Sequence, residues 1–349
     1  MNMMSISLCV LLLAGWAVPA AAREFTVGVL YWSMNIPGQV AMRQGLEEEA
    51  RRLQQEAKAS GRDGIRLLSH VAGDGEEGIE NQIKQMHALI AQKVDLIIVQ
   101  PTDNAALGDA LIAANRARIP VVAYDQYISR GELAAFRTSD NYQAGYLGGE
   151  YIASRFGSGR ELKLVLVEYP HVSSTVERVN GFLDALGEQK VSYRVLRGYS
   201  AVEPVAGRKA AAAILADFPT PGDVDVVFTV NDGGGLAVVE ALAQAERTEI
   251  QVATVDGDPV SVTNIRKGKL TVIDAAQFCG PLGAEAMRAG YGILIGQQPP
   301  RHALVPVFPV TRETMTRYPG WMGPLPDSFS KPWPSKEPEW NGALRVIRQ

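Results

Sequence analysis

The sequence predicts an α/β fold with two doubly wound parallel-sheet lobes. From residue 23 to about residue 268, short apolar runs alternate with amphipathic stretches at helical spacing. Apolar runs bounded by polar residues, Gly or Pro are typical of strands buried on both faces of a parallel sheet. The pattern also restarts, with one block over residues 25–127 and a similar block over residues 140–256. Such a repeat indicates two similar lobes with a cleft between them.

The first strand is predicted over residues 25–30, followed by a polar and aromatic loop over residues 31–39. The helix after this loop places Met42, Leu46 and Ala50 on one face. Later strands are predicted over residues 96–99, 121–124, 164–167, 226–230 and 252–255, with helices between them. Ligands of open α/β sheets bind at loops that follow the carboxyl ends of strands. The loop over residues 31–39 therefore either contacts a polyhydroxylated small molecule or is simply solvated.

The first 22 residues are predicted to be a signal peptide. Residues 6–18 form its apolar core, and residues 19–22 (Pro-Ala-Ala-Ala) offer a small-residue cleavage site near Ala22. A membrane anchor is the alternative, but the apolar run is short for a span of about 20 residues.

Composition and spacing argue against several chemistries. A formal net charge of −4, without a basic block, gives no support for nucleic-acid binding. The four His residues lack metal-ligand spacing, and no nucleophile–base pair is suggested by the local sequence. Gly233 to Gly235 do not form a dinucleotide fingerprint. We therefore expect no catalytic residues, no metal site and no cofactor.

Residues 318–349 form a C-terminal extension rich in Pro and Trp. We expect repeated Pro to prevent regular helix or sheet, whereas a disordered tail would usually lack so many aromatic residues. We expect an ordered, extended segment that lies on a lobe or on a partner and adds nothing to the ligand cleft. A partly disordered end is the alternative.

Residues 25–317 contain a series of short segments that form a pattern together. In chain order they are Met34-Asn35-Ile36-Pro37 with Gln44-Gly45, Gln100-Pro101-Thr102-Asp103, Tyr124-Asp125-Gln126, Ser173 to Arg178 with Asn180-Gly181-Phe182, Phe228 to Asp232, Val255-Asp256-Gly257 and Ala276-Gln277. These segments resemble the periplasmic sugar-binding proteins of the ribose/galactose type. Each segment is weakly specific alone, but their order and spacing together are specific.

The resemblance implies the type I periplasmic binding protein fold, in which a three-crossing hinge joins the two lobes. The N-terminal lobe would comprise residues 25–139 plus 278–306. The C-terminal lobe would comprise residues 140–277 plus 307–317. Ligand that bonds to both lobes would favour the closed state.

The resemblance also implies the residues that bind ligand. Carried over residue by residue, they are Asp125, Arg178, Asn231, Asp256 and Gln277, and Asn35 and Gln126 join them from the same segments. These side chains suit a sugar, because Asp accepts hydrogen bonds, Arg donates them, and Asn and Gln do both. A lone Asp at a strand end has the alternative role of a turn former.

The first loop departs from the family pattern. Gly38 and Gln39 stand where relatives often have an aromatic pair, so we expect Trp32 to stack on the ligand instead. Tyr31, Gln39 and His171 are further candidates for ligand contact. These departures indicate a site rebuilt for a sugar, polyol or similar neutral molecule other than simple ribose or glucose.

By resemblance, the chain is a monomeric periplasmic protein that captures a sugar or polyol and delivers it to an ABC-type permease. The alternative partner is a membrane sensor, either a histidine kinase or a chemoreceptor. An enzyme on the same fold is a remote third possibility, because no nucleophile–base constellation appears.

Overall fold

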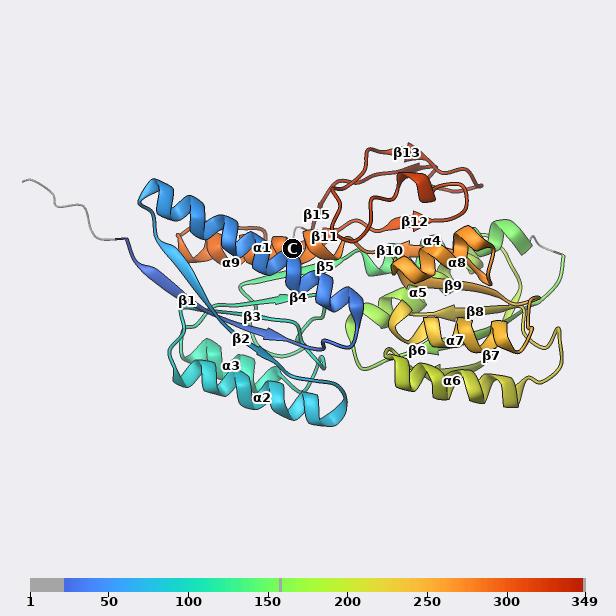
Figure 1. Ribbon diagram of the computed structural model, residues 1–349, viewed down its shortest axis with the longest axis horizontal. Coiled ribbons are helices and arrows are strands. Elements are labelled where there is room, and N and C mark those ends of the chain that lie inside the picture. The colour runs from blue at the N-terminus through green and yellow to red at the C-terminus, as the bar shows by residue number, and fades with distance from the viewer. Residues whose placement is uncertain (1–21, 157–158, 348–349) are drawn as a thin grey trace, which may run out of the picture.

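The computed structural model describes residues 22–156 and 159–347, so residues 1–21 of the predicted signal peptide lie outside it. Two helix-covered sheets lie side by side along the long axis of the molecule (Figure 1). We call them, with their helices, the first and the second lobe. The predicted α/β fold of two doubly wound lobes is confirmed.

The first lobe is built on a seven-stranded sheet in the order β15-β11-β5-β4-β3-β1-β2. Its strands are β1 (Glu24–Tyr31), β2 (Gly64–Val71), β3 (Leu96–Val99), β4 (Val121–Tyr124), β5 (Ala135–Ser139), β11 (His302–Val305) and β15 (Arg345–Ile347). The pairings are parallel except for that of β15, which runs antiparallel to β11. One face of the sheet is covered by α1 (Pro37–Ser60) and α9 (Cys279–Leu294), the other by α2 (Gly75–Ala91) and α3 (Gly108–Arg116).

Both faces of this sheet are buried, as the continuous apolar runs predicted. Every residue of β3 and β4 is buried. In β1, Val29 packs into the core beneath α1 and α9, whereas Leu30 packs into the core beneath α2 and α3. Successive side chains of a strand point to opposite faces, so one short run supplies two cores.

The second lobe is built on a six-stranded sheet in the order β12-β10-β9-β8-β6-β7. Its strands are β6 (Leu162–Glu168), β7 (Tyr193–Ser200), β8 (Val226–Thr229), β9 (Gln251–Asp256), β10 (Thr271–Ala276) and β12 (Phe308–Val310). Its helices are α4 (Asn141–Phe156), α5 (Ser173–Glu188), α6 (Pro204–Asp217), α7 (Asp232–Gln244) and α8 (Pro259–Lys267). Only β12 pairs antiparallel, and it does so with β10.

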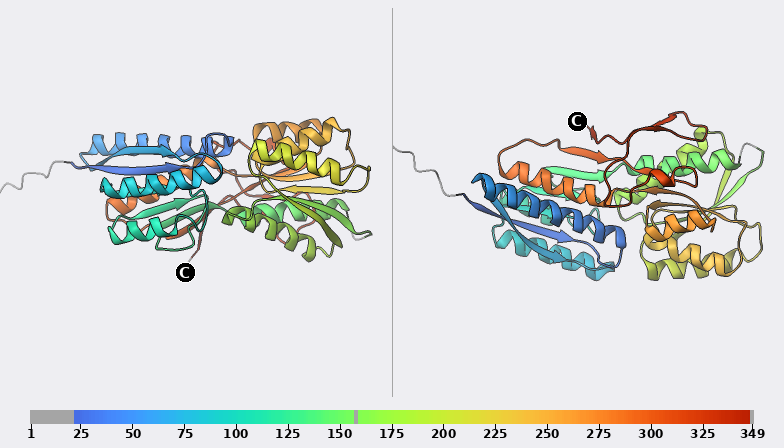
Figure 2. Two further views of the ribbon diagram at one scale, coloured as in Figure 1. Left: turned by 90° about the horizontal axis from the view of Figure 1, so that it is seen from below. Right: turned by 45° about the horizontal axis from the view of Figure 1, so that its top comes forward.

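The chain crosses between the sheets where β5 leads into α4, where β10 leads into α9, and where β11 leads into β12. These are the three crossings that the resemblance implied. A further crossing follows, because the chain leaves β12 in the second lobe and returns to the first lobe as β15. The two views in Figure 2 show this C-terminal segment running along both lobes.

The C-terminal segment departs in part from its predicted form. It is ordered and extended, but it contains a two-stranded sheet of β13 (Phe329–Ser330) and β14 (Glu339–Trp340), and it follows directly on a 3-10 turn at Met315–Arg317. The expectation that Pro would prevent any sheet was therefore too strict. These strands, like β15, are only two or three residues long: β13 lies between Pro326 and Pro332, and β14 and β15 follow Pro338, the last proline of the sequence.

Among residues 22–156 and 159–347, no helix has both the length and the apolar character that crossing a bilayer requires.

Candidate ligand-binding site

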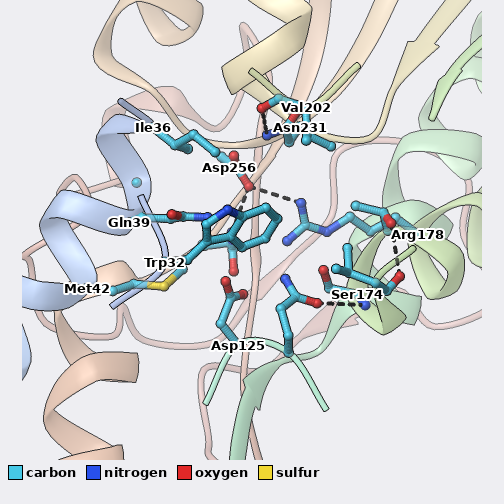
Figure 3. A pocket seen from close by; sticks show the side chains of 15 residues that line it. Trp32, Ile36, Gln39, Met42, Asp125, Ser174, Arg178, Val202, Asn231 and Asp256 are labelled. Atoms are coloured by element: carbon cyan, nitrogen blue, oxygen red, sulfur yellow. Dashed lines mark hydrogen bonds and ion pairs between the residues drawn. The ribbon is translucent and has the colours of Figure 1, made fainter. Parts of the chain in front are cut away.

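A cavity lies between the lobes, at the carboxyl ends of the strands of both sheets (Figure 3). The space between its side chains is about 410 Å³, part of which is open to solvent. Its walls are Trp32, Ile36, Gly38, Gln39, Met42, Asp125, Gln126, Val172, Ser174, Thr175, Arg178, Val202, Asn231, Asp256 and Gln277. The walls combine apolar side chains with a small number of charged and amide groups, as small-molecule sites do.

The first lobe supplies an aromatic wall and a carboxylate. Trp32 follows β1 and has only 6% of its surface exposed. Asp125 follows β4, and its carboxylate accepts a hydrogen bond from Gln100 Nε2 at 2.9 Å. Gln39, in the first turn of α1, accepts a hydrogen bond from the backbone N–H of Ser33 at 2.9 Å. That bond anchors the loop that carries Trp32 onto the helix.

Arg178 on α5 is the positively charged side chain that the second lobe contributes to the cavity, and three hydrogen bonds hold it. Its Nε donates to Asn141 Oδ1 at 2.9 Å, and its Nη1 donates to the Val230 carbonyl at 2.8 Å and to Asp256 Oδ1 at 3.1 Å. Packing of α5 against α4 makes this possible, because a Cβ on Gly145 would lie 1.8 Å from the Arg178 carbonyl oxygen.

Asp256, at the end of β9, also accepts a hydrogen bond from Gln277 Nε2 at 2.6 Å. Gln277 Oε1 in turn accepts from Ser139 Oγ at 2.7 Å, so this side chain links the two lobes. Asn231 caps α7 by accepting from the Gly234 N–H at 3.2 Å. The polar walls of the cavity are thus fixed in place by bonds among themselves and to the backbone.

Burial sets the charge state of the carboxyl groups. Loss of water raises the pKa of Asp256 to about 7, although Arg178 and Gln277 oppose the rise. Burial likewise raises the pKa of Asp125, against the effect of Gln100. Both carboxylates would gain from ligand hydroxyl groups that donate hydrogen bonds, since a buried charge is costly until its lone pairs are satisfied.

Two further acids support the loop behind Asp256. Asp274 accepts the Gly257 N–H at 2.9 Å, and Asp232 accepts the Asp258 N–H at 2.8 Å. Desolvation and the nearby Asp274 raise the pKa of Asp232. Desolvation raises the pKa of Asp274 to about 6. Residues 256–258 are therefore held by buried carboxyl groups rather than by apolar packing alone.

The structure brings most of the predicted site residues together at the cavity. They are Trp32, Gln39, Asp125, Gln126, Arg178, Asn231, Asp256 and Gln277. It places the remaining three elsewhere. Asn35 lines an adjoining hollow and donates to Asp74 Oδ2 at 2.7 Å.

Tyr31 and His171 also lie away from the cavity walls. Tyr31 is fully buried in the core of the first lobe, where its hydroxyl donates to Glu47 Oε1 at 3.2 Å. Its strand position explains this, because its side chain points to the face opposite that of Leu30. His171 is exposed, and its ring lies 4.9 Å from that of Tyr169.

Sequence reasoning missed several walls of the cavity: Ile36, Gly38, Met42, Val172, Ser174, Thr175 and Val202. Ser174 and Thr175 could have been predicted, because they belong to the segment that suggested Arg178 and lie in the first turn of the same helix. Met42 looked like a core residue from its helical spacing. Val172 and Val202 lie in loops that no local pattern marks.

The lobes are in direct contact beside the cavity. Ser173 N donates to Asn104 Oδ1 at 3.1 Å, and Tyr127 N donates to Ser173 Oγ at 3.2 Å. Ser174 N donates to Gln126 Oε1 at 3.3 Å. Each bond joins one lobe to the other, so the structure has the lobes closed on this side.

No group of three or more His, Cys, Asp or Glu side chains within the described residues is arranged to hold a metal ion. Cys279 is fully buried at the start of α9.

Two lobes around a polar, interlobe cavity define a two-lobe solute-binding protein. The family described as the periplasmic binding protein domain matches residues 27–298, and the chain belongs to this family. The predicted resemblance to periplasmic sugar-binding proteins of the ribose type is thereby confirmed.

Curated relatives extend over most of the chain. The ribose import binding protein of Bacillus subtilis is 28% identical over 276 residues, which cover 78% of this chain and 84% of the relative. The Escherichia coli ribose import binding protein is 28% identical over 279 residues, which cover 80% of this chain and 88% of the relative.

A solved structure supports the fold. The periplasmic solute-binding protein of an ABC transporter from Actinobacillus succinogenes, with bound D-allose, has a TM-score of 0.71 at 24% identity. The match covers 84% of this chain and all of that one.

Proposed function

We propose that this protein is a periplasmic solute-binding protein that captures a sugar or sugar-like polyol and delivers it to an ABC-type permease. It acts as a monomer and as a binding protein rather than an enzyme. Asp125, Arg178, Asn231, Asp256 and Gln277 bond the ligand hydroxyl groups, together with Gln126, and Trp32 stacks on the apolar face of the ring.

One observation carries the proposal. Asp125 of the first lobe and Arg178 and Asp256 of the second lobe line the same buried cavity. A ligand in that cavity can bond to both lobes at once. Such bonds exist only when the lobes are together, so the ligand has a higher affinity for the closed state and shifts the population toward it. The permease then recognises the closed form.

The relatives suggest the class of ligand. Curated relatives are named for ribose, D-allose and xylitol, and solved structures of the same fold hold D-allose and myo-inositol. All are neutral molecules with several hydroxyl groups, which match walls that combine carboxylates, amides and a guanidinium. Gly38 and Gln39 leave Trp32 as the aromatic side chain that lines the cavity.

A thermal-shift screen of the mature chain tests the proposal. The panel comprises D-ribose, D-allose, xylitol, myo-inositol and furanones, each at millimolar concentration. A ligand at 100 times its Kd adds about 2.7 kcal/mol to the free energy of unfolding. A shift in melting temperature with at least one polyol, lost in Asp256→Asn, supports the function. A flat response to the whole panel would exclude these ligands and count against a sugar site.

A further inference from the structure

The C-terminal segment of residues 318–347, here called the strap, contacts all three crossings of the hinge. Arg345 pairs with Asp140 at 2.8 Å beside the first crossing. Tyr318 donates its hydroxyl to the Gln277 carbonyl at 3.3 Å on the second. Trp340 Nε1 donates to the Val307 carbonyl at 2.6 Å on the third. No segment that merely covers one lobe would make these contacts.

The strap is attached firmly to each lobe. In the second lobe, Lys331 and Trp333 both donate to the buried Glu150 Oε2 on α4, each at 2.9 Å. In the first lobe, the strap ends as β15, which pairs with β11. A segment anchored at both ends resists rotation of one lobe against the other, because opening would stretch it or break an anchor.

Trp321 is the point at which the strap reaches the candidate ligand site. Its indole Nε1 donates to the carbonyl oxygen of Asp256 at 2.6 Å, in the second lobe. Its own carbonyl accepts from the N–H of Gly280 at 3.0 Å, in the first turn of α9 in the first lobe. One strap residue therefore joins the two lobes directly behind the cavity.

The contact is closely fitted. A Cβ on Gly280 would lie 2.7 Å from Met322 Sδ and 3.2 Å from Met322 Cα, so the strap and α9 are in close contact here. Asp256 has φ of 128°, a backbone conformation that non-glycine residues rarely adopt. The Trp321 indole bonds to the carbonyl of that same residue and so helps to hold it in this conformation.

We propose that the strap is a clamp on the hinge and that Trp321 is a positioning residue for Asp256. By joining Asp256 to α9, Trp321 favours the closed arrangement and aims the Asp256 carboxyl group at the cavity. The predicted effect of Trp321 on ligand affinity rests on the proposed solute-binding function. The predicted effect of the strap on the separation of the lobes does not, because it requires no ligand.

The first experiment measures the separation of the lobes without ligand. Spin labels on Glu77→Cys in α2 and Arg208→Cys in α6, both exposed, report the interlobe distance by pulsed electron paramagnetic resonance. The native Cys279 is fully buried, which protects it from labelling. The labelled protein is compared with the same protein carrying Trp321→Phe, which removes the indole donor but keeps an aromatic ring.

Trp333→Phe is the matched control, because it removes an indole hydrogen bond of the same strap within the second lobe alone and leaves Lys331 bonded to Glu150 as the anchor. We expect Trp321→Phe to increase the population at longer distances, and Trp333→Phe to leave the distribution unchanged. Equal distributions in all three proteins, or equal shifts in both variants, would overturn the role of Trp321. If Trp321→Phe does not fold, Arg345→Ala is measured in its place. It loosens the strap at the first crossing and should also increase the population at longer distances.

The second experiment measures affinity by calorimetry, with D-ribose, D-allose and myo-inositol as probes. For any probe that binds the unmodified protein, Trp321→Phe should raise Kd about three- to tenfold, the effect of one lost hydrogen bond. Trp333→Phe should leave Kd unchanged. An unchanged Kd in Trp321→Phe would overturn the positioning role. If no probe binds the unmodified protein, the proposed sugar function fails with these probes, while the distance measurement still decides the clamp.

Discussion

Asp125 and Asp256 occupy corresponding places in the two lobes and share an unusual backbone. Asp125 follows β4 and Asp256 ends β9, with φ of 64° and 128° respectively. Non-glycine residues with positive φ are uncommon and cost free energy, which the surrounding structure must offset. Here both residues line the same cavity, so each lobe contributes one carboxyl group to it.

Loss of the Arg178–Asp256 pair should weaken ligand binding. Arg178→Ala or Asp256→Ala is expected to cost about 2–4 kcal/mol of binding free energy, because each leaves a buried polar partner unpaired. Calorimetry with a polyol identified by the screen measures the loss, and circular dichroism checks the fold. Arg208→Ala, an exposed arginine on α6, is the control and should not change affinity. Unchanged affinity in both site variants would remove them from the binding site.

The stability of the ligand-free protein should fall as pH rises from about 4 to about 7. The folded Asp256 holds its proton up to a pKa of about 7, whereas in the unfolded chain its pKa is near 3.8. The folded state thus binds more protons in this window, so stability decreases with pH there and levels off above it. Raised pKa values of Asp125 and Asp274 act in the same direction.

Melting temperatures between pH 4.5 and 8 test this expectation, with Asp256→Asn as the variant that lacks the titrating group. As pH rises, the melting temperature of Asp256→Asn should fall less than that of the unmodified protein. Affinity should show the opposite trend, because hydroxyl donors favour ionised Asp256 and bind more tightly as pH passes 7. Parallel profiles for the two proteins would mean that Asp256 does not titrate as described.

Trp32 should report ligand binding through its fluorescence. It lines the cavity and is 6% exposed, so a stacked sugar ring changes its surroundings. The fluorescence change on adding a polyol should largely disappear in Trp32→Phe. Trp321, Trp333 and Trp340 also emit, so the test compares the ligand-induced difference spectra of the two proteins. The same change in both would place the responding indole outside the cavity.

The buried ion pair between the strap and α4 should contribute strongly to stability. The side chain of Lys331 is 4% exposed and that of Glu150 is fully buried. Lys331→Ala leaves a buried carboxylate without its cation, which typically costs about 3–5 kcal/mol. Urea unfolding measures the effect.

Lys336→Ala is the matched control, since Lys336 belongs to the same strap but pairs with Glu188 at the surface. Exposed pairs contribute little, so this variant should unfold at the urea concentration of the unmodified protein. Equal effects of the two substitutions would show that the buried pair has no special role.

Much of the fold could be predicted because it depends on local patterns. Four-residue apolar runs such as residues 96–99 and 121–124 specify strands buried on both faces, whatever packs on them. The restart of the pattern near residue 140 specifies a second lobe. Asp125 and Asp256 were proposed for the site from the resemblance, and their place after such strands agrees with it, because strand ends of a parallel sheet meet at one edge.

Other features depend on contacts between distant parts of the chain. The sequence around Asn35 and His171 matches a binding loop, yet Asn35 bonds to Asp74 and His171 lies at the surface. Val202 has no local signal at all, and it reaches the cavity only because the lobes approach each other there.

The sequence by itself determined the strands, the two lobes and the polar residues at the strand ends, because hydrophobic periodicity and strand-end position are local properties. Only the tertiary structure decided which side chains share the cavity and where the strap lies. Pro and Trp content predicted an ordered extension, but the bonds from Trp321 to Asp256 and Gly280 join residues more than 40 positions apart. Such contacts follow from how the lobes pack, which no local pattern encodes.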